Sequence, residues 1–291
     1  MGIAMIPEHR PHSAAMAHTA QEMVGGVVWQ TVALAAGAAA VIVAAMTAGA
    51  LELLPLWAVA LTVYGAIYVI YTPLHEAVHQ NISGRRQDLG WLNTLVGTVA
   101  AFFLLHSYGM HKTIHLTHHR ATNDPRNDPD HWVKGGNLLT TALRCMTIFN
   151  GYFFYCRRHW DDAQMRRAFW IGLRDSALAV AALVAVGAVA GWQLAVFGYA
   201  IPAILAAMTL GFLFDYAVHT PHQARARFEN TRVFVFPEPL DTLVTWAYVQ
   251  QNYHGVHHAF PRIPFTRYRQ FFRTVRCDIE AAGLPVARPL G

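Results

Sequence analysis

Charged residues are scarce in this chain of 291 residues: Asp, Glu, Lys and Arg together make up 13%, whereas hydrophobic residues make up 54%. This composition argues against an ordinary soluble domain and favours a membrane protein. Cysteine is scarce as well. The three cysteines, Cys145, Cys156 and Cys277, form no CxxC pair, so we expect neither a disulfide framework nor a cysteine-based metal site.

Four apolar runs approach or exceed the roughly 20 residues that a spanning helix needs. They cover 27–51, 53–74, 169–192 and 193–214. Only Arg174 and Asp175 interrupt them with charge; we favour a local ion pair near the membrane interface, and a functional role is the alternative. A fifth run, 92–105, is too short for a straight crossing. We therefore predict an all-α integral membrane bundle of about four spanning helices plus a short re-entrant or interfacial segment.

The distribution of basic residues predicts the orientation of this bundle. The connections at 48–54 and 191–193 contain no Lys or Arg, and all 22 basic residues lie before the first run, between Arg85 and Arg174, or after Phe214. The basic segments are therefore expected on the cytoplasmic side, where they would form a helical cap. For a bacterial protein this membrane would be the inner membrane.

The chain divides into two parts by composition. Residues 1–26 are polar and precede an apolar run that is too long for a signal-peptide core, so we interpret them as a loosely ordered cytoplasmic N-terminal arm. Residues 27–291 are expected to form a single membrane domain. The sequence pI near 9.3 requires no nucleic acid as partner, because a basic cytoplasmic face beside anionic lipid explains it.

Histidine is abundant although charged residues are scarce. Eight of the 17 histidines fall into three clusters, each at a point where an apolar segment meets a polar one. The clusters are His75-Glu-Ala-Val-His79, His115-Leu-Thr-His118-His119 and His254-Gly-Val-His257-His258. Residues at i, i+3 and i+4 share one helix face, so each cluster is expected to present its imidazoles in one direction. An octahedral ion accepts six donors at most, so eight clustered imidazoles indicate at least two metal ions. We interpret the isolated histidines as ordinary core or surface residues: His9, His12, His18, His131 and His159.

Three boxes of the form HxxxH, HxxHH and HxxHH on paired membrane spans resemble the membrane fatty acid desaturase and hydroxylase superfamily, whose members use a histidine-bound di-iron centre and dioxygen. The resemblance runs from about His75 to Tyr268. Within it, several segments are similar to the bacterial and cyanobacterial β-carotene hydroxylase branch. These are 115–130, 214–219, and 251–258 followed by 261–265.

The resemblance implies a set of metal ligands, which comprises the eight box histidines and His219, beyond the fourth apolar run. It also implies polar side chains that orient the ligand imidazoles, and the candidates are Asp215, Asn252, Asp124, Asp128 and Asp130. Two further candidates for this role are His111, which lies one helical turn before His115, and His222, which the cyanobacterial pattern usually lacks. Asn252 and the three acidic residues of 124–130 could equally serve to form turns, as in an Asn-Asp-Pro loop, instead of orienting a ligand. For Asp215 the alternative to orienting an imidazole is binding a metal directly or through water. The chain departs from the carotenoid branch at Ser83, where that branch often has a further histidine.

The implied activity is that of a membrane di-iron oxidase, which uses dioxygen and external electrons to hydroxylate or desaturate a lipophilic substrate from the bilayer. The substrate would be a carotenoid ring or a fatty acyl chain. The sequence carries no haem, flavin or nicotinamide motif, so the electrons are expected from a separate donor such as ferredoxin with its reductase.

Two other functions are weighed against this one. A membrane metal transporter would carry ionisable residues deep inside several spans, whereas these histidines lie at span ends. A zinc-dependent membrane hydrolase would need one three-ligand site with a general base such as Glu76, and this leaves six other histidines unexplained.

Overall fold

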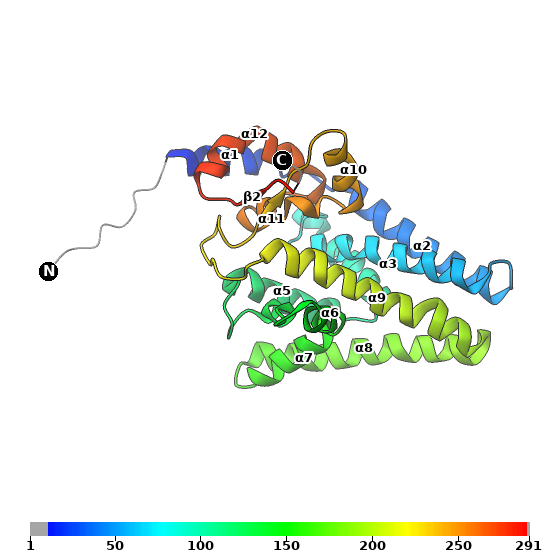
Figure 1. The fold of residues 1–291 in the computed structure, drawn as a ribbon. Helices are drawn as coiled ribbons and strands as arrows, with labels where there is room; N and C mark the ends of the chain where they lie inside the picture. Colours follow the sequence, from blue (N-terminus) through cyan, green and yellow to red (C-terminus); the bar gives the residue numbers. More distant parts are fainter. Residues whose placement is uncertain (1–10, 290–291) are drawn as a thin grey trace.

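The computed structural model describes residues 11–289, which are almost entirely helical (Figure 1). Within this part of the chain, four helices are long and apolar enough to cross a membrane. They are α2 (Trp29–Ala50), α3 (Leu56–Val78), α8 (Ala163–Ala190) and a composite helix over Leu194–Ala217. The predicted helical membrane bundle is thus confirmed. At the end where the histidine clusters lie, the helices extend past the apolar runs of the sequence. Helix α3 continues to Val78, so the first histidine cluster lies at its end.

The fourth span is not a uniform α-helix. It combines η3 (Leu194–Ala200), α9 (Ile201–Leu210) and η4 (Gly211–Ala217), and the two η segments are π-helical. Short π segments inside longer helices occur frequently at functional sites. Here η4 carries Asp215, and the chain reaches His219 just beyond its end.

The predicted short segment forms a bent helix pair. Helix α4 (Trp91–Phe103), preceded by η1 (Gln87–Leu89), meets α5 (Tyr108–Ala121) at an angle of 101°. Gly97 permits this packing, because a Cβ there would lie 2.4 Å from the Tyr108 ring. The Tyr108 hydroxyl donates to the carbonyl of Ala77 at 3.0 Å. The start of α5 is thereby fixed against the end of α3, and the second histidine cluster faces the first.

The charged pair inside the third span also supports α5. Arg174 Nη2 lies 2.7 Å from Asp175 Oδ1, as expected for a local ion pair. The other Asp175 oxygen accepts a hydrogen bond of 2.6 Å from the Ser107 hydroxyl, and Ser107 in turn caps α5 by accepting from the backbone N–H of Met110. A side-chain N-cap satisfies a backbone donor that the helix itself leaves free.

The remaining elements line the bundle or cover one end of it. Helices α6 and α7 pack on α9 and α8, whereas α1 and the residues after 218 form a cap over the histidine clusters. Strands β1 and β2 of the cap pair in parallel. The bounds are α1 (Pro11–Met23), η2 (Pro129–Val133), α6 (Leu138–Met146), α7 (Ile148–Arg158), β1 (Val233–Phe234), α10 (Leu240–Ala247), η5 (Gln251–Tyr253), α11 (His254–Ala259), η6 (Phe265–Arg267), α12 (Tyr268–Ala281) and β2 (Val286–Ala287).

The N-terminal arm is more ordered than the sequence predicts. Residues 11–23 form α1, and this helix packs on α12 (Figure 1). Met16 and Ala20, one turn apart on the same face, are 1% and 7% exposed. Two apolar residues make only a weak amphipathic pattern in the sequence. They are buried because they pack on an apolar surface of α12, which the sequence alone does not reveal. Residues 1–10, including His9, lie outside the described part.

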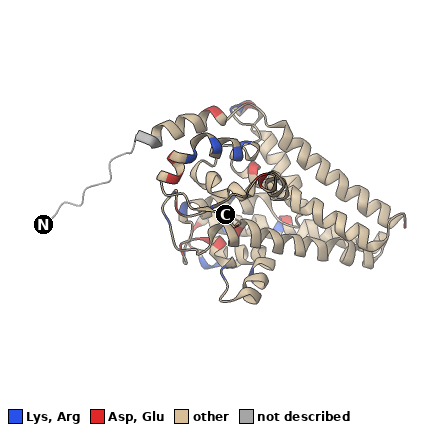
Figure 2. Cartoon of the chain, turned by 45° about the horizontal axis from the view of Figure 1, so that its top comes forward, with Lys and Arg blue, Asp and Glu red and all other residues tan. Residues whose placement is uncertain are grey.

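Charged residues are concentrated at the cap end of the molecule, and the long helices contain few of them (Figure 2). Large apolar side chains on the spans point outward instead; Leu61 is 64% exposed and Val189 is 88% exposed. Exposed apolar residues over whole helices are the surface that a lipid bilayer covers. The chain is therefore a membrane protein with one polar, charged end.

Candidate metal centre

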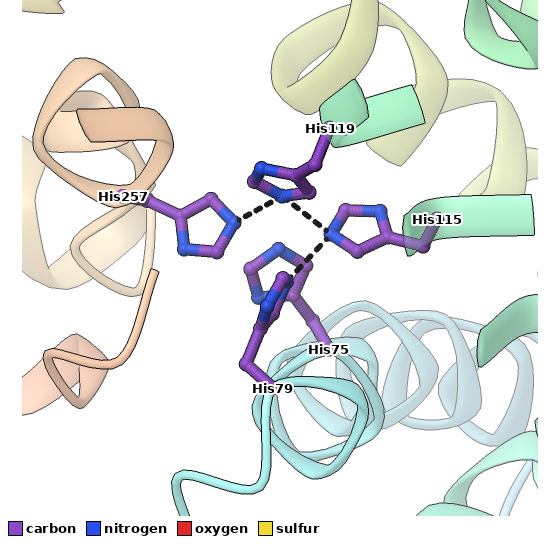
Figure 3. Close-up of side chains that lie close together, drawn as sticks. All are labelled: His75, His79, His115, His119 and His257. Carbon is purple, nitrogen blue, oxygen red and sulfur yellow. Dashed lines mark hydrogen bonds between the residues drawn. The ribbon is translucent and has the colours of Figure 1, made fainter. Parts of the chain in front are cut away.

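Five buried or half-buried histidines from three helices converge beneath the cap (Figure 3). Their ligand atoms all lie within 4.8 Å of one another. We call them the five-histidine group: His75, His79, His115, His119 and His257. The first two come from the end of α3, the next two from α5 and the last from α11.

The contacts within the five-histidine group join Nε2 atoms to one another. The distances are 2.9 Å from His79 to His115, 3.1 Å from His115 to His119 and 2.9 Å from His119 to His257. Two neutral imidazole nitrogens at this distance repel unless a proton or a cation lies between them. His75 is 1% exposed, and neither of its nitrogens has a hydrogen-bond partner. Such atoms are costly when left unsatisfied, so this donor set fits a metal ion.

A second set adjoins the first. The three-histidine group consists of His118, His219 and His258, whose ligand atoms also lie within 4.8 Å of one another. The Nε2 atoms of His118 and His258 are 3.3 Å apart, and the His219 ring centroid is 4.8 Å from each of the other two. All three residues are buried. The described residues therefore hold two adjacent histidine groups, in line with the two ions that the count of imidazoles indicated.

Helices α5 and α11 each supply both groups. Neighbouring residues on a helix project about 100° apart, so consecutive histidines face different directions. His118 and His119 are thereby divided between the groups, and so are His257 and His258. The expectation that a cluster presents all its imidazoles in one direction holds for His75 and His79, but it was wrong for the second and third clusters for this reason. The HH pair at the end of these two clusters makes the two groups neighbours.

His254 lies beside both groups without belonging to either. Its ring centroid is 4.7 Å from that of His258 and 5.2 Å from that of His257. Its Nδ1 hydrogen-bonds to the Oε1 of Gln251 at 3.0 Å. Since an amide oxygen only accepts, Nδ1 carries the proton and Nε2 keeps its lone pair for a metal. Gln251, which sequence reasoning missed, sits three residues before His254, a spacing that brings two side chains of one helical turn together.

Asp128 orients His118. Its Oδ1 accepts from His118 Nδ1 at 2.8 Å, and Asp130 Oδ2 lies 3.4 Å from the same nitrogen. The backbone N–H groups of Asn123 and Asp130 donate to the Asp128 carboxylate at 2.7 and 2.9 Å. A carboxylate on Nδ1 directs the Nε2 lone pair of His118 into the three-histidine group. Of the acidic residues singled out from the sequence, Asp128 and Asp130 are the two that contact a box histidine.

A buried carboxyl group also acts on the five-histidine group, through a tyrosine. The Tyr268 hydroxyl donates to Glu76 Oε1 at 3.2 Å and contacts His257 Nδ1 at 2.9 Å. Because the hydroxyl proton points to Glu76, its oxygen accepts from His257 Nδ1–H. Burial, and then Glu76, raises the pKa of Tyr268 well above its ordinary value, so the hydroxyl remains a donor.

Glu76 is fixed in turn by its own contacts. It is 0% exposed, and its second oxygen accepts from the backbone N–H of Phe265 at 2.9 Å. Asn81 Nδ2 lies 3.4 Å from the first oxygen. Glu76 thus ties the end of α3 to the start of α12. The sequence contains a signal for Glu76, which lies inside the first box, but none for Tyr268, because its partner is 192 residues away.

The other polar candidates occupy different positions. Asp124 accepts from the backbone N–H groups of Arg126 and Asn127 at 2.8 and 3.1 Å, which are contacts of a turn. Asn252 donates to the carbonyl of Phe234 at 3.1 Å and to Thr245 Oγ1 at 3.2 Å, and these bonds hold η5 against β1. Both residues therefore stabilise loops around the site.

Three further candidates are buried near the groups but lie outside them. Asp215 is 8% exposed and lies one turn before His219. His111 stacks on His115 with 5.7 Å between ring centroids, and neither of its nitrogens has a hydrogen-bond partner. His222 lies 6.2 Å from His219 by the same measure. Of the isolated histidines, His18 is exposed and pairs with Glu22, and His159 Nδ1 hydrogen-bonds to the carbonyl of Tyr155.

The cap histidines are held in the neutral form. Burial, followed by the repulsion of neighbouring imidazoles, lowers the pKa of four of them well below the ordinary value: His219, His254, His257 and His258. A neutral imidazole offers a lone pair, whereas a protonated one cannot bind a metal. These four imidazoles can therefore offer a lone pair to a cation.

Comparison with known proteins assigns this arrangement to a family. The model of the family described as "Fatty acid desaturase" matches residues 53–289. The chain belongs to the fatty acid desaturase family. The match covers the eight box histidines, His219 and three of the four spans; the remaining span, α2, precedes it. A search of curated proteins returned no match.

Membership of the fatty acid desaturase family agrees with what the geometry shows. The family is of the di-iron oxidoreductase type, and the two buried histidine groups are suited to binding metal ions. The resemblance seen in the histidine boxes is thus confirmed for the family. The match is to the family as a whole and does not distinguish the carotenoid hydroxylase branch within it.

Proposed function

We propose that this protein is a membrane di-iron oxidase that uses dioxygen to hydroxylate or desaturate a lipophilic substrate. The observation that carries the proposal is the pair of adjacent buried histidine groups at the polar end of an apolar bundle. One ion would be held by the five-histidine group and the other by the three-histidine group. His254 would complete the set of nine ligands. When bound, the two irons would supply the oxidising power for a C–H bond, which side-chain acids and bases lack.

The protein's own residues prepare the site for this chemistry. Asp128 and the Glu76–Tyr268 pair hold His118 and His257 with their Nε2 atoms facing inward. The cap, including α11 and α12, covers the groups, and most of the histidines are less than 7% exposed. Exclusion of bulk water protects a reactive centre from side reactions. The orientation of these two ligands is therefore set by buried hydrogen bonds and would not depend on the metal alone.

A lipophilic substrate is supported by a cavity between the spans. It has a volume of about 270 Å³ and is lined almost entirely by apolar side chains from α2, α4, α8 and the fourth span, with Leu105 at one edge. The next residue, His106, packs against His111 at 5.5 Å, and His111 stacks on His115. Packed rings thus connect this cavity to the five-histidine group. A carotenoid ring and a fatty acyl chain are the two substrate classes that we propose.

The electrons would come from a separate carrier such as ferredoxin with its reductase. We place the cap on the cytoplasmic side, because the charged residues are concentrated there and basic segments favour that side. In a bacterium the spans would lie in the inner membrane. A carrier could then approach the histidine groups from the aqueous phase.

The two alternative functions fit the site less well. A transporter needs a path across the membrane, whereas the two histidine groups lie together at one end of the spans. A zinc hydrolase would use Glu76 as a general base, but Glu76 is engaged by Tyr268 and by the Phe265 backbone. Both alternatives also leave the second histidine group without a role.

Metal analysis combined with turnover tests the proposal. Protein from iron-replete cells should contain about two irons per chain. With reduced ferredoxin it should consume dioxygen and convert a carotenoid or acyl lipid, as followed by mass spectrometry. His118→Ala and His257→Ala, one from each group, should lower the iron content and abolish conversion, whereas the exposed control His18→Ala should change neither. Stoichiometric zinc without oxygen consumption would overturn the proposal.

A further inference from the structure

A polar cavity of about 330 Å³ opens between the loop after the fourth span and the C-terminal end of the cap. One of the side chains that line it is His219 of the three-histidine group. The other walls come from three segments: 220–224, 229–232 and 283–285, together with Asn123. This cavity is separate from the apolar one between the spans, and the two share no lining residue.

Three buried oxygen atoms of residues that line this cavity have no hydrogen-bond partner. They are Asn123 Oδ1, Asn230 Oδ1 and Thr231 Oγ1, and their residues are 2%, 7% and 3% exposed. Buried polar atoms are almost always satisfied by protein or by ordered water. Three such atoms therefore belong to residues in the walls of one polar cavity, whose volume can hold water.

The side-chain amide of Asn123 and the backbone of Asn230 are held by hydrogen bonds, so Asn123 Oδ1 is not free to turn to other partners. Asn123 Nδ2 donates to the carbonyls of Ala224 and Asn230 at 2.7 and 2.8 Å. The backbone N–H of Asn230 donates to the carbonyl of Ala226 at 3.0 Å. These residues therefore line the cavity together with His219, a candidate metal ligand.

The proposed reaction requires an aqueous route, as its balance shows. Hydroxylation combines RH, O₂, two electrons and two protons to give ROH and one water; desaturation combines RH₂ with the same reagents to give the alkene and two waters. Electrons come from the carrier and the oxidant is dioxygen, but protons have to arrive from water and product water has to leave. The apolar cavity between the spans is unsuited to both. A chain of hydrogen-bonded waters transfers protons readily.

We infer that the polar cavity at Asn123, Asn230 and Thr231 is the aqueous channel of the site, through which protons reach the metal centre and water leaves it. This inference rests on the proposed function. A second polar cavity, of about 210 Å³, is lined by three arginines and Asp128. From the site, this second cavity is lined only by Asp128, the carboxylate that accepts from His118, whereas the first cavity is lined by His219 of the three-histidine group. The first cavity is therefore the more direct route.

A bulky side chain that blocks the cavity tests the inference in an assay that does not depend on substrate conversion. Ala224 lines the cavity, and Ala226, on the same loop, does not. In iron-loaded protein, Ala224→Trp should slow the removal of ferrous iron by a small water-soluble chelator by about tenfold, equivalent to about 1.4 kcal/mol in the barrier. The matched control Ala226→Trp should leave the rate unchanged. Equal rates in both variants and the parent protein would overturn the inference.

A conservative substitution tests proton delivery. Thr231→Val keeps the shape of the side chain but removes the unpartnered hydroxyl, so folding and iron content should be unchanged. The turnover rate should fall about tenfold, and the ratio of rates in H₂O and D₂O should increase because proton transfer becomes limiting. An unchanged rate and isotope ratio would contradict the role of the channel. If the parent protein binds no iron, the proposed function fails instead, so the two failures are distinguishable.

Discussion

The hydroxyl of Tyr268 offers the sharpest test of how the protein holds its metal ligands. It accepts from His257 Nδ1–H at 2.9 Å and donates to Glu76 at 3.2 Å, with all three side chains buried. Tyr268→Phe leaves the His257 N–H without a partner and Glu76 with one fewer. An unsatisfied buried group costs about 1–3 kcal/mol, and we expect the free energy of unfolding to fall by that amount.

Iron affinity should fall as well, because His257 is no longer held with Nε2 facing the group. Loss of a partner that orients a ligand typically lowers metal affinity about 10–100-fold. Competition between protein and a chelator for ferrous iron, under anaerobic conditions in detergent, measures this change.

Tyr253→Phe provides a matched control. Tyr253 is equally buried in the cap, and its hydroxyl donates to a carboxylate, Asp241, at 3.0 Å, but it contacts no imidazole through that hydroxyl. This variant should lose comparable stability while keeping its iron affinity. If both variants bind iron equally well, or lose affinity equally, Tyr268 has only a structural role and the reasoning is refuted.

Three further predictions concern the cap and the second histidine group. Asp128→Asn should lower iron affinity about 10–100-fold because His118 loses its carboxylate partner, whereas Asp124→Asn should not, and the same chelator competition compares them. The metal-free protein should unfold at lower temperature as the pH falls below about 6.5, where imidazoles of the unfolded chain gain protons that the buried, low-pKa His254, His257 and His258 resist; an unfolding temperature that does not fall below that pH would contradict the assignment. Met16→Ala should lower the free energy of unfolding by about 2–5 kcal/mol, because Met16 is 1% exposed beneath α12; denaturation that matches the parent protein would show that α1 does not contribute to the cap.

Much of this molecule could be predicted from patterns that are local in sequence. The length and apolarity of four runs predicted four spans, because a bilayer imposes its thickness on any helix that crosses it. The spacing and number of the histidines predicted a centre for two ions, because coordination numbers are limited. The Arg174–Asp175 ion pair joins neighbours in sequence and could likewise be predicted. In each case the physical constraint acts within a few residues or on a whole segment.

Other features depended on how distant segments meet. The grouping of His118 with His219 and His258, the Glu76–Tyr268–His257 contacts and the packing of α1 on α12 all join residues far apart in the chain. A sequence shows which side chains can bind a metal or donate a hydrogen bond. Only the tertiary structure decides which of them face one another, because a hydrogen bond depends on tenths of an ångström and on the burial of both partners.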